Sequence, residues 1–379
     1  MHLEAWVCPN CGTKNEPFSR FCRNCGAERP GLWRCSKGHL NVPFAEFCTQ
    51  CGEPRAKQPP PLPPLDIARL EELFVCKSVD VELPVVIPVE RPSSPLLIHG
   101  YECRSLLNLT EISATLLCVD ENAANHVLKI PARYYLQRRS GGRDIRKTTF
   151  GNFGREVEVL RDVASLKHCS IVKFEEAFEA QGDSPPTLVF EYCEGGSLED
   201  VLKEYAREGK KLGPVTAARI IVQVAAALKK IHELGYAHGD VKPGNILFSR
   251  DCIPKLADFN SARAIAVVSH SRVPLTYGYA SPEHVRGGRP SQKGDVWSLA
   301  LTLYEAATGE NLFPLAETEY IEAIAGLEDG EKPEIETGDS DLDEIVERCL
   351  KVRPEERPSM EQFEEMLIKY LLKKLGMER

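Results

Sequence analysis

Residues 238–247 read His-Gly-Asp-Val-Lys-Pro-Gly-Asn-Ile-Leu, and residues 256–260 read Leu-Ala-Asp-Phe-Asn. Carboxylates therefore stand at Asp240 and Asp258, with a lysine at Lys242 and an amide at Asn245 between them. Phosphoryl transfer needs a carboxylate at the attacking hydroxyl and separate oxygen ligands for magnesium. The two stretches contain residues of both kinds.

The two stretches resemble the catalytic loop and the metal-binding motif of eukaryotic-type protein kinases. The resemblance implies that Asp240 is the catalytic base and that Lys242 contacts the phosphate in transfer. Asn245 and Asp258 would hold the Mg2+ or Mn2+ ions that accompany ATP. Lys242, close after the base, is more similar to the serine/threonine class of the family than to the tyrosine class.

Upstream motifs follow the order of the same family. Residues 126–130 resemble the strand whose lysine contacts the α- and β-phosphates, which makes Lys129 that lysine. Residues 153–160 resemble the helix whose glutamate pairs with it. The resemblance selects Glu156 as the partner over Glu158, and the pair would hold the ammonium group against phosphate oxygens.

Residues 188–198 resemble the hinge between the two lobes of the family, with Phe190 at the gatekeeper position. The resemblance implies that backbone groups of Glu191 and Cys193 receive the adenine ring of ATP. Val127 and Leu247 would sandwich the ring. Val127 stands where the family usually has alanine, which predicts a tighter adenine slot.

Motifs of the helical lobe come next. Residues 276–283 end in Pro-Glu and resemble the substrate-side loop, and residues 295–299 match a helical anchor of the family. Glu283 and Arg357 match a structural ion pair. The resemblance covers residues 99–375 and implies an α+β, bilobal protein-kinase-like fold with a β-rich N-lobe and an α-helical C-lobe.

The periodicity of the sequence agrees with two lobes. Short β-like runs occur at Ile112–Val119, His126–Ile130 and Leu188–Tyr192, with one helix predicted at Phe153–Lys167. Helical periodicity dominates later and is strongest at Pro214–Leu234, which has proline in its first turn and a glycine just after its end. A ligand is expected in the cleft between the two lobes.

The phosphate loop departs from the family pattern. It should lie between Glu102 and Leu117 and carry three glycines, but the matching positions are Asn108, Thr110 and Ser113. Glycine lets the backbone approach phosphates closely, so this loop should hold nucleotide less tightly. Two functions stay open: an ATP-dependent serine/threonine protein kinase acting on a protein substrate, and a pseudokinase scaffold with weak or no turnover.

Two Cys-x-x-Cys knuckles stand near the N-terminus, and their ligands are Cys8, Cys11, Cys22 and Cys25. Two such knuckles complete a closed tetrahedral zinc site. A module this small has little core without metal, so free buried thiols are the weaker interpretation.

The motif repeats once, because Trp6-Val7-Cys8 returns as Trp33-Arg34-Cys35 and residues 17–26 return as residues 43–52. In the repeat Gly38 matches Cys11, and His39 stands beside it. The predicted second zinc site consists of Cys35, His39, Cys48 and Cys51. A metal-free degenerate repeat is the alternative.

As a pair, the modules resemble the double zinc ribbon found beside many prokaryotic signalling domains. The resemblance implies two structural Zn2+ sites that serve protein interactions. Residues 1–58 carry eight Lys/Arg against five Asp/Glu, whereas the whole chain has a net charge of −9. Interleaved acidic residues argue against nucleic-acid binding, although a nucleic-acid reader regulated by the kinase domain is a third, weaker hypothesis.

The predicted organisation has three parts. Residues 1–57 form the double zinc ribbon, with modules at 6–28 and 33–53. Residues 58–98 form a linker with a proline-rich spacer, a short helix at Leu65–Cys76 and edge-strand segments at Val79–Ile98. Residues 99–375 form the kinase-like domain.

An insertion between Lys129 and Glu156 carries six basic residues: Arg133, Arg138, Arg139, Arg143, Arg146 and Lys147. It is interpreted as a mobile, solvated loop, with docking of an acidic substrate or of the protein's own acidic surface as the functional alternative.

Composition supports a cytoplasmic globular protein. Hydrophobic residues make up 42% and charged residues 27% of the chain, and no long apolar run or signal-peptide start is visible. No membrane contact is expected. Of fourteen cysteines, those beyond the ribbons are scattered singly, so they are expected to pack as small hydrophobes without disulfides.

Overall fold

The computed structural model describes residues 6–8, 11, 13–16, 19, 21–25, 33–34, 37, 40–41, 67–84, 96–139, 153–259, 262–264, 276–328 and 333–377. The chain divides into two compact units, residues 1–66 and residues 67–379. The proline-rich spacer and the predicted second zinc ligands lie outside the described residues; those ligands are Cys35, His39, Cys48 and Cys51.

The first unit contains the same small element twice. Strand β1 (Trp6–Val7) pairs antiparallel with β2 (Lys14–Asn15), and β3 (Trp33–Arg34) pairs antiparallel with β4 (Leu40–Asn41). In each hairpin the backbone register pairs a tryptophan with an asparagine, Trp6 with Asn15 and Trp33 with Asn41. The second hairpin is shorter by one residue between the paired positions.

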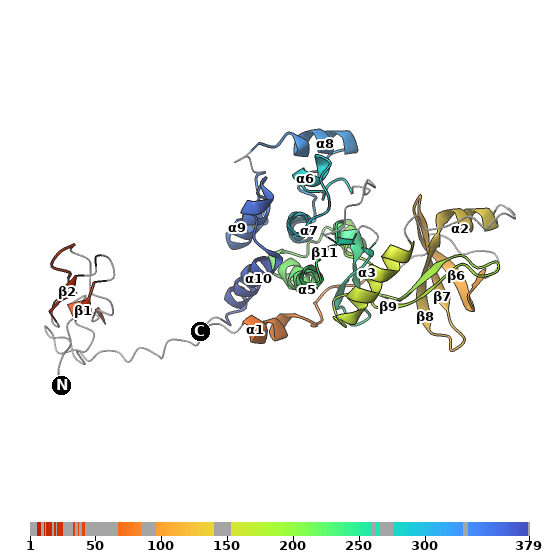
Figure 1. Cartoon of the computed structure of the whole chain (residues 1–379), viewed down its shortest axis with the longest axis horizontal. Helices are drawn as coiled ribbons and strands as arrows, with labels where there is room; N and C mark the ends of the chain where they lie inside the picture. Colours follow the sequence, from red (N-terminus) through yellow and green to blue (C-terminus); the bar gives the residue numbers. More distant parts are fainter. Residues whose placement is uncertain are drawn as a thin grey trace. The chain divides into compact units, whose positions relative to one another are not determined.

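The N-lobe is built on one antiparallel sheet of six strands (Figure 1). Its strands lie in the order β5-β6-β7-β8-β10-β9. Their bounds are β5 (Leu96–Ile98), β6 (Tyr101–Leu109), β7 (Ser113–Val119), β8 (Asn125–Pro131), β9 (Phe174–Phe178) and β10 (Thr187–Glu191). Helix α3 (Phe153–Ser165) connects β8 to β9 and packs against β9. The three β-like runs predicted from the sequence correspond to β7, β8 and β10.

Strand alternation decides which way Lys129 points. Leu128 and Ile130 are fully buried in the core of the sheet, and Leu116 of the neighbouring strand packs with them. Successive side chains of a strand point to opposite faces, so Lys129 projects from the other face of β8. In the ladder Lys129 stands opposite Leu188 of β10.

The start of the basic insertion is helical. Helix α2 (Ala132–Arg139) buries Tyr134 and Tyr135 in the core of the N-lobe, and the Tyr134 hydroxyl donates a hydrogen bond to the Asp183 carbonyl at 2.7 Å. The interpretation as a solvated loop is therefore wrong for this part, because the two aromatic side chains are anchored by burial. Residues 140–152 lie outside the described residues, among them Arg143, Arg146 and Lys147.

The cysteines correct a second expectation. Cys103 of β6 lies opposite Cys118 of β7, and the two buried residues form a disulfide. Cys76 forms a disulfide with Cys169, 93 residues further along the chain. The spacing of these cysteines in the sequence does not indicate either disulfide, because the fold brings together positions that are far apart in the chain. Cys193 and Cys349 are unpaired and buried, as small hydrophobes would be.

The C-lobe is helical, with α5 packed between α7 and α10 (Figure 1). The helices are α4 (Leu198–Arg207), α5 (Pro214–Glu233), α6 (Pro282–Val285), α7 (Gln292–Thr308), α8 (Glu317–Ala325), α9 (Ser340–Cys349) and α10 (Met360–Lys374), with 3-10 turns η1 (Pro243–Asn245) and η3 (Pro354–Glu356). Short antiparallel pairs join β11 (Tyr236–Ala237) to β14 (Arg263–Ala264) and β12 (Ile246–Phe248) to β13 (Pro254–Leu256).

Helix α5 shows how local signals fix an element. Gly213 adopts φ +78°, and Pro214, whose missing N–H costs nothing in the first turn, begins the helix. Apolar residues then surround the helix on most sides, which is typical of a buried helix. The prediction of Pro214–Leu234 is confirmed within one residue.

No helix in the described part of the chain is long and apolar enough to cross a bilayer.

Residues 67–84 form a strap on the C-lobe. It begins with α1 (Ile67–Phe74), which contacts α5 and α10, and Phe74 and Val79 are buried in the same core as α5. The Gln223 amide accepts a hydrogen bond from the Lys77 N–H at 3.0 Å and donates one to the Lys77 carbonyl at 2.9 Å. The strap is thus packed on the helical lobe, although its sequence predicted a linker; the short helix predicted at Leu65–Cys76 is confirmed as α1.

A charged cluster joins the strap to two helices of the lobe. Lys229 of α5 contacts Glu71 of α1, and its Nζ lies 2.6 Å from the Glu364 Oε2 of α10. Glu364 is almost fully buried. Burial raises the pKa of Glu364 to about 7, because desolvation outweighs the opposing effect of the Lys229 ammonium.

This raised pKa predicts a pH dependence of stability. The folded chain binds the Glu364 proton more tightly than the unfolded chain does, so the contribution of this group to the unfolding free energy falls as pH rises from about 4.5 to about 7. Glu364→Gln cannot ionise. The unfolding free energy of the variant relative to wild type should therefore increase across this window, by at most about 1.4 kcal/mol per pH unit.

Urea unfolding at pH 5 and pH 8 measures this difference, with Glu355→Gln at an exposed position of η3 as the control. A difference between Glu364→Gln and wild type that is the same at both pH values would contradict the assignment.

Candidate active site

A buried carboxylate holds the loop that carries the predicted catalytic residues. Asp295 of α7 accepts hydrogen bonds from the backbone N–H groups of His238 and Gly239, both at 2.8 Å. The His232 Nε2 lies 2.7 Å from the same carboxylate. Burial opposes ionisation of Asp295, but the contacts with His232 and with the backbone prevail and lower its pKa. The loop is therefore fixed at its start by an ionised side chain.

Asp240, Lys242, Asn245 and Thr276 form one hydrogen-bonded cluster. The Thr276 hydroxyl donates to the Asp240 Oδ1 at 2.6 Å, and the Lys242 Nζ lies 2.9 Å from the Asp240 Oδ2. Lys242 also donates to the Thr276 hydroxyl oxygen at 2.8 Å. The Asn245 amide nitrogen donates to the Asp240 carbonyl at 2.7 Å and to its Oδ2 at 2.9 Å. The sequence-predicted residues are thus brought together around one carboxylate.

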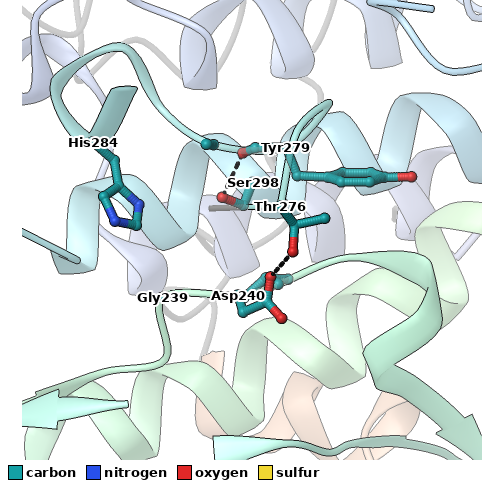
Figure 2. A pocket seen from close by; sticks show the side chains of 8 residues that line it. Gly239, Asp240, Thr276, Tyr279, His284 and Ser298 are labelled. Carbon is teal, nitrogen blue, oxygen red and sulfur yellow. Dashed lines mark hydrogen bonds between the residues drawn. The ribbon is translucent and has the colours of Figure 1, made fainter. Parts of the chain in front are cut away.

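A small pocket opens beside this cluster (Figure 2). It is lined by Gly239, Asp240, Val241, Thr276, Tyr279, Ala280, His284 and Ser298. Figure 2 shows the Thr276 hydroxyl directed at Asp240 and the Ser298 hydroxyl directed at the Tyr279 carbonyl, a contact of 2.8 Å. The Tyr279 hydroxyl donates to the Glu305 Oε2 at 2.5 Å. Both contacts fix the wall that faces Asp240 to helix α7.

Lys129 meets two carboxylates from different elements. Its Nζ lies 2.9 Å from the Asp258 Oδ1 and 3.8 Å from the Glu156 Oε1 of α3. Asp258 adopts φ +62°, a left-handed conformation that is uncommon outside glycine. The pairing of Lys129 with Glu156 that the sequence predicted is confirmed as a contact, and the structure adds Asp258 to it.

The predicted adenine-contacting residues come from both lobes. Val127 lies on β8 opposite Phe190 of β10, whereas Leu247 lies on β12 of the helical lobe. The Glu191 Oε1 accepts hydrogen bonds from the Lys173 N–H at 2.7 Å and from the Lys255 Nζ at 2.8 Å. These bonds tie the sheet to the helical lobe at the hinge.

Cys193 follows at the same hinge. Burial raises the pKa of its thiol to about 12, so the side chain is a neutral, apolar group.

The loop between β6 and β7 uses its own polar groups. The Thr110 Oγ1 accepts hydrogen bonds from the N–H groups of Ile112 and Ser113 at 3.3 Å and 3.0 Å, and the Thr110 N–H donates to the Ser113 carbonyl at 2.9 Å. A glycine-rich loop would offer such N–H groups to phosphates. Here the Thr110 hydroxyl accepts hydrogen bonds from these N–H groups instead.

The ion pair predicted between Glu283 and Arg357 is present. The two guanidinium nitrogens of Arg357 donate to the two carboxylate oxygens of Glu283 at 2.9 Å and 2.8 Å, and Arg357 is buried. The guanidinium also lies over the Trp297 ring, 5.0 Å from its centroid. This two-point pair secures the end of the substrate-side loop to the base of the lobe.

Two residues of the site were not singled out from the sequence. Thr276 was quoted only as part of a loop, and Asp295 only as part of a helical anchor. Neither has a strong local signal for its role, because each acts on a loop that lies far away in the sequence. A polar residue beside a Tyr-Gly turn is the weak signal that could have pointed to Thr276.

The cysteines of the first ribbon converge on one point. Cys8 Sγ lies 3.6 Å from Cys25 Sγ, Cys11 Sγ lies 3.5 Å from Cys22 Sγ, and all four sulfurs lie within 4.8 Å of one another. Zinc–sulfur bonds of about 2.3 Å in a tetrahedron place ligand sulfurs about 3.8 Å apart. The four cysteines therefore fit a zinc ion.

Asn15 and Thr13 support the four-cysteine cluster. Asn15 is buried, its amide donates to the Thr13 carbonyl at 2.8 Å, and its Oδ1 accepts from the Arg23 N–H at 3.0 Å, so it joins the two knuckles. Hydrogen bonds from the side chain and backbone of Thr13 lower the pKa of Cys11 to about 6. Thiolate is the form that binds zinc.

A β-sheet lobe, a helical lobe and a catalytic-loop cluster held by α7 define a kinase-like protein. The family model of the protein kinase domain matches residues 137–367, and a zinc-ribbon model matches residues 7–29. The chain belongs to the protein kinase domain family and carries a zinc-ribbon domain at its N-terminus. The kinase match begins after Lys129, so it does not include the strands β5 to β8 or the strap.

Serine/threonine-protein kinases are among the similar proteins. The chain is 33% identical to "Serine/threonine-protein kinase PknB" of Mycobacterium leprae over 214 residues, which is 54% of this chain and 33% of that protein. It is 32% identical to "Serine/threonine-protein kinase Nek4" of Mus musculus over 202 residues, 52% of this chain and 25% of that protein. The chain thus spans about a quarter to a third of the length of these relatives.

The β6–β7 loop yields a prediction on nucleotide affinity. Thr110→Gly removes the hydroxyl that occupies the N–H groups of Ile112 and Ser113, and it removes the Cβ from the path of a phosphate. The variant should bind ATP several-fold more tightly than wild type, as measured by displacement of a fluorescent nucleotide. Asn122→Gly in the next hairpin turn is the control and should leave the affinity unchanged. Equal affinities of Thr110→Gly and wild type would show that Thr110 does not limit binding.

Proposed function

We propose that the chain is an ATP-dependent serine/threonine protein kinase that transfers the γ-phosphate of ATP to a protein hydroxyl. One observation carries the proposal. The Thr276 hydroxyl is held between Asp240 and Lys242, at 2.6 Å from the carboxylate and 2.8 Å from the ammonium group. The site is therefore built to hold a hydroxyl between a proton acceptor and a positive charge.

In the proposed reaction, Asp240 orients the acceptor hydroxyl and takes its proton. The hydroxyl oxygen forms a bond to the γ-phosphorus while the bond to the β–γ bridging oxygen breaks, and ADP leaves. Lys242, 2.9 Å from Asp240, is placed to meet the negative charge of the phosphoryl group. Lys129, beside Glu156 and Asp258, would meet the other phosphates.

The residues present fit a divalent cation. The Asn245 amide nitrogen donates to Asp240, so its oxygen is left as an acceptor, and Asp258 supplies a carboxylate. Oxygen donors of these two kinds suit Mg2+ or Mn2+. Bound there, the cation would neutralise charge on the phosphates. Glu191, Cys193, Val127 and Leu247 are the residues proposed to receive adenine.

The zinc ribbons are proposed to bind protein and to hold one Zn2+ each. The four-cysteine geometry supports the first site, and the repeated hairpin with its Trp–Asn register supports a second module of the same kind. The domain limits proposed from the sequence, 1–57, 58–98 and 99–375, stay proposals; the strap argues that the kinase unit includes residues from 67 onward.

A pseudokinase scaffold is the second candidate, and the β6–β7 loop favours it. The Thr110 side chain engages the N–H groups that would cradle phosphates, and the exposed Glu111 at the tip would repel them. Two observations argue against the scaffold. Lys129 contacts Glu156 and Asp258, and Asp240 lies in its own hydrogen-bonded cluster. Turnover decides between the two.

Radiolabelled ATP tests the kinase function. Asp240→Asn keeps the shape of the side chain but cannot accept the proton, so incorporation of the γ-phosphate into protein should fall by about 100-fold or more. Asp251→Asn in the exposed turn after β12 is the matched control and should label like wild type. Equal labelling of wild type and Asp240→Asn, or no labelling of any of the three, would sink the enzyme hypothesis and leave the scaffold.

Metal analysis tests the ribbons separately. The purified chain should contain two zinc ions, and Cys22→Ser or Cys48→Ser should each reduce the content to one, as measured by plasma mass spectrometry. Cys252→Ser, outside both ribbons, is the control. One zinc in wild type, unaffected by Cys48→Ser, would mean that the second module holds no metal.

A further inference from the structure

The disulfide between Cys76 and Cys169 joins the strap to the N-lobe side of the molecule. Cys76 follows α1 in the strap, and Cys169 lies in the loop after α3, with 5.7 Å between the two Cα atoms. That separation lies within the ordinary range for a disulfide. Two segments far apart in the sequence are therefore held together at a point outside the candidate active site.

The two disulfides among the described residues differ in access to solvent. Cys76 is exposed and Cys169 is half-buried, whereas Cys103 and Cys118 are both buried within the sheet. Thiol–disulfide exchange and thiol oxidation both require that a reagent reach the sulfur. Only the first pair meets this condition, so it is the pair that small oxidants and thiols can convert.

The strap keeps its place without the disulfide. Gln223 holds both backbone groups of Lys77, Arg219 donates to the Ser78 carbonyl at 3.2 Å, and the Val79 N–H donates to the Cys252 carbonyl at 3.0 Å. Reduction would therefore leave Cys76 near Cys169, ready to pair again. This is the arrangement that a reversible bond needs.

The loop around Cys169 connects two parts of the candidate active site. On one side it continues from α3, the helix that carries Glu156. On the other side the Val172 N–H donates to the Leu256 carbonyl and the Leu256 N–H donates to the Ser170 carbonyl, both at 2.9 Å. Leu256 ends β13, which leads directly to Asp258. A covalent bond at Cys169 thus acts at the joint between Glu156 and Asp258, the two partners of Lys129.

We propose that Cys76 and Cys169 are an oxidant-responsive thiol pair whose disulfide clamps the loop after α3 to the strap and restrains α3. A peroxide is the oxidant: one thiolate attacks the O–O bond and becomes a sulfenic acid with release of hydroxide. The second thiolate attacks that sulfur, forms the S–S bond and displaces a second hydroxide, and the two thiol protons complete two waters. Exchange with two small thiols reverses the step and yields their disulfide.

Mass spectrometry of the native full-length chain tests the chemistry. Dithiothreitol, then hydrogen peroxide, is applied before alkylation and digestion without reductant. The Cys76–Cys169 cross-linked peptide should disappear on reduction and return on oxidation, while Cys103–Cys118 stays unchanged. A cross-link that never forms, or one that resists dithiothreitol in the folded chain, would overturn the proposal.

Hydrogen exchange tests the restraint. Amides of residues 153–172 should exchange several-fold more slowly in the oxidised chain than in the reduced chain. Cys76→Ser and Cys169→Ser should each abolish this difference, and Cys252→Ser, whose thiol lies beside the strap at 3.9 Å from the Val81 carbonyl, should keep it. Equal exchange in the oxidised and reduced wild type would show that the bond does not restrain α3. Neither readout requires ATP turnover, so both stand apart from the proposed function.

Discussion

Asp295 projects from α7 into the interior of the helical lobe, where its two oxygens accept the N–H groups of His238 and Gly239. An ionised carboxylate at a fully buried position is costly unless it is hydrogen-bonded, and here His232 and two backbone N–H groups supply the contacts. The loop that follows therefore has one orientation. Asp240 faces Thr276, and Asn245 completes the turn by bonding back to Asp240.

The charged groups around Asp240 and Lys129 differ from the β6–β7 loop in how well they are placed to meet a phosphate. Around Asp240 and Lys129 the charged groups meet in a dense network, and the sheet alternation that buries Leu128 and Ile130 delivers the ammonium to that network. In the β6–β7 loop, the N–H groups that a phosphate would need already donate hydrogen bonds to the Thr110 hydroxyl. In the proposed function, nucleotide binding and phosphoryl transfer therefore depend on separate elements of the fold.

The packing of the strap argues that the kinase unit begins before residue 99. Its apolar residues complete the core around α5, and the Lys229 cluster joins it to α10 through a carboxylate whose pKa burial raises to about 7. The same segment places Cys76 against the loop after α3. A part that looks like a linker in sequence is therefore packed into the core and joined to the loop that follows the helix of Glu156.

The sequence by itself determined the elements with strong local signals: α5 with its proline start, the catalytic-loop spacing, and the four cysteines of the first ribbon. It also determined the pairs Lys129–Glu156 and Glu283–Arg357, because their motifs occur in a known order. Only the tertiary structure decided the helix α2, the packing of the strap on the helical lobe, the disulfides, and the roles of Thr276 and Asp295. Those features depend on contacts between residues far apart in the chain, which leave no period or spacing in the sequence itself.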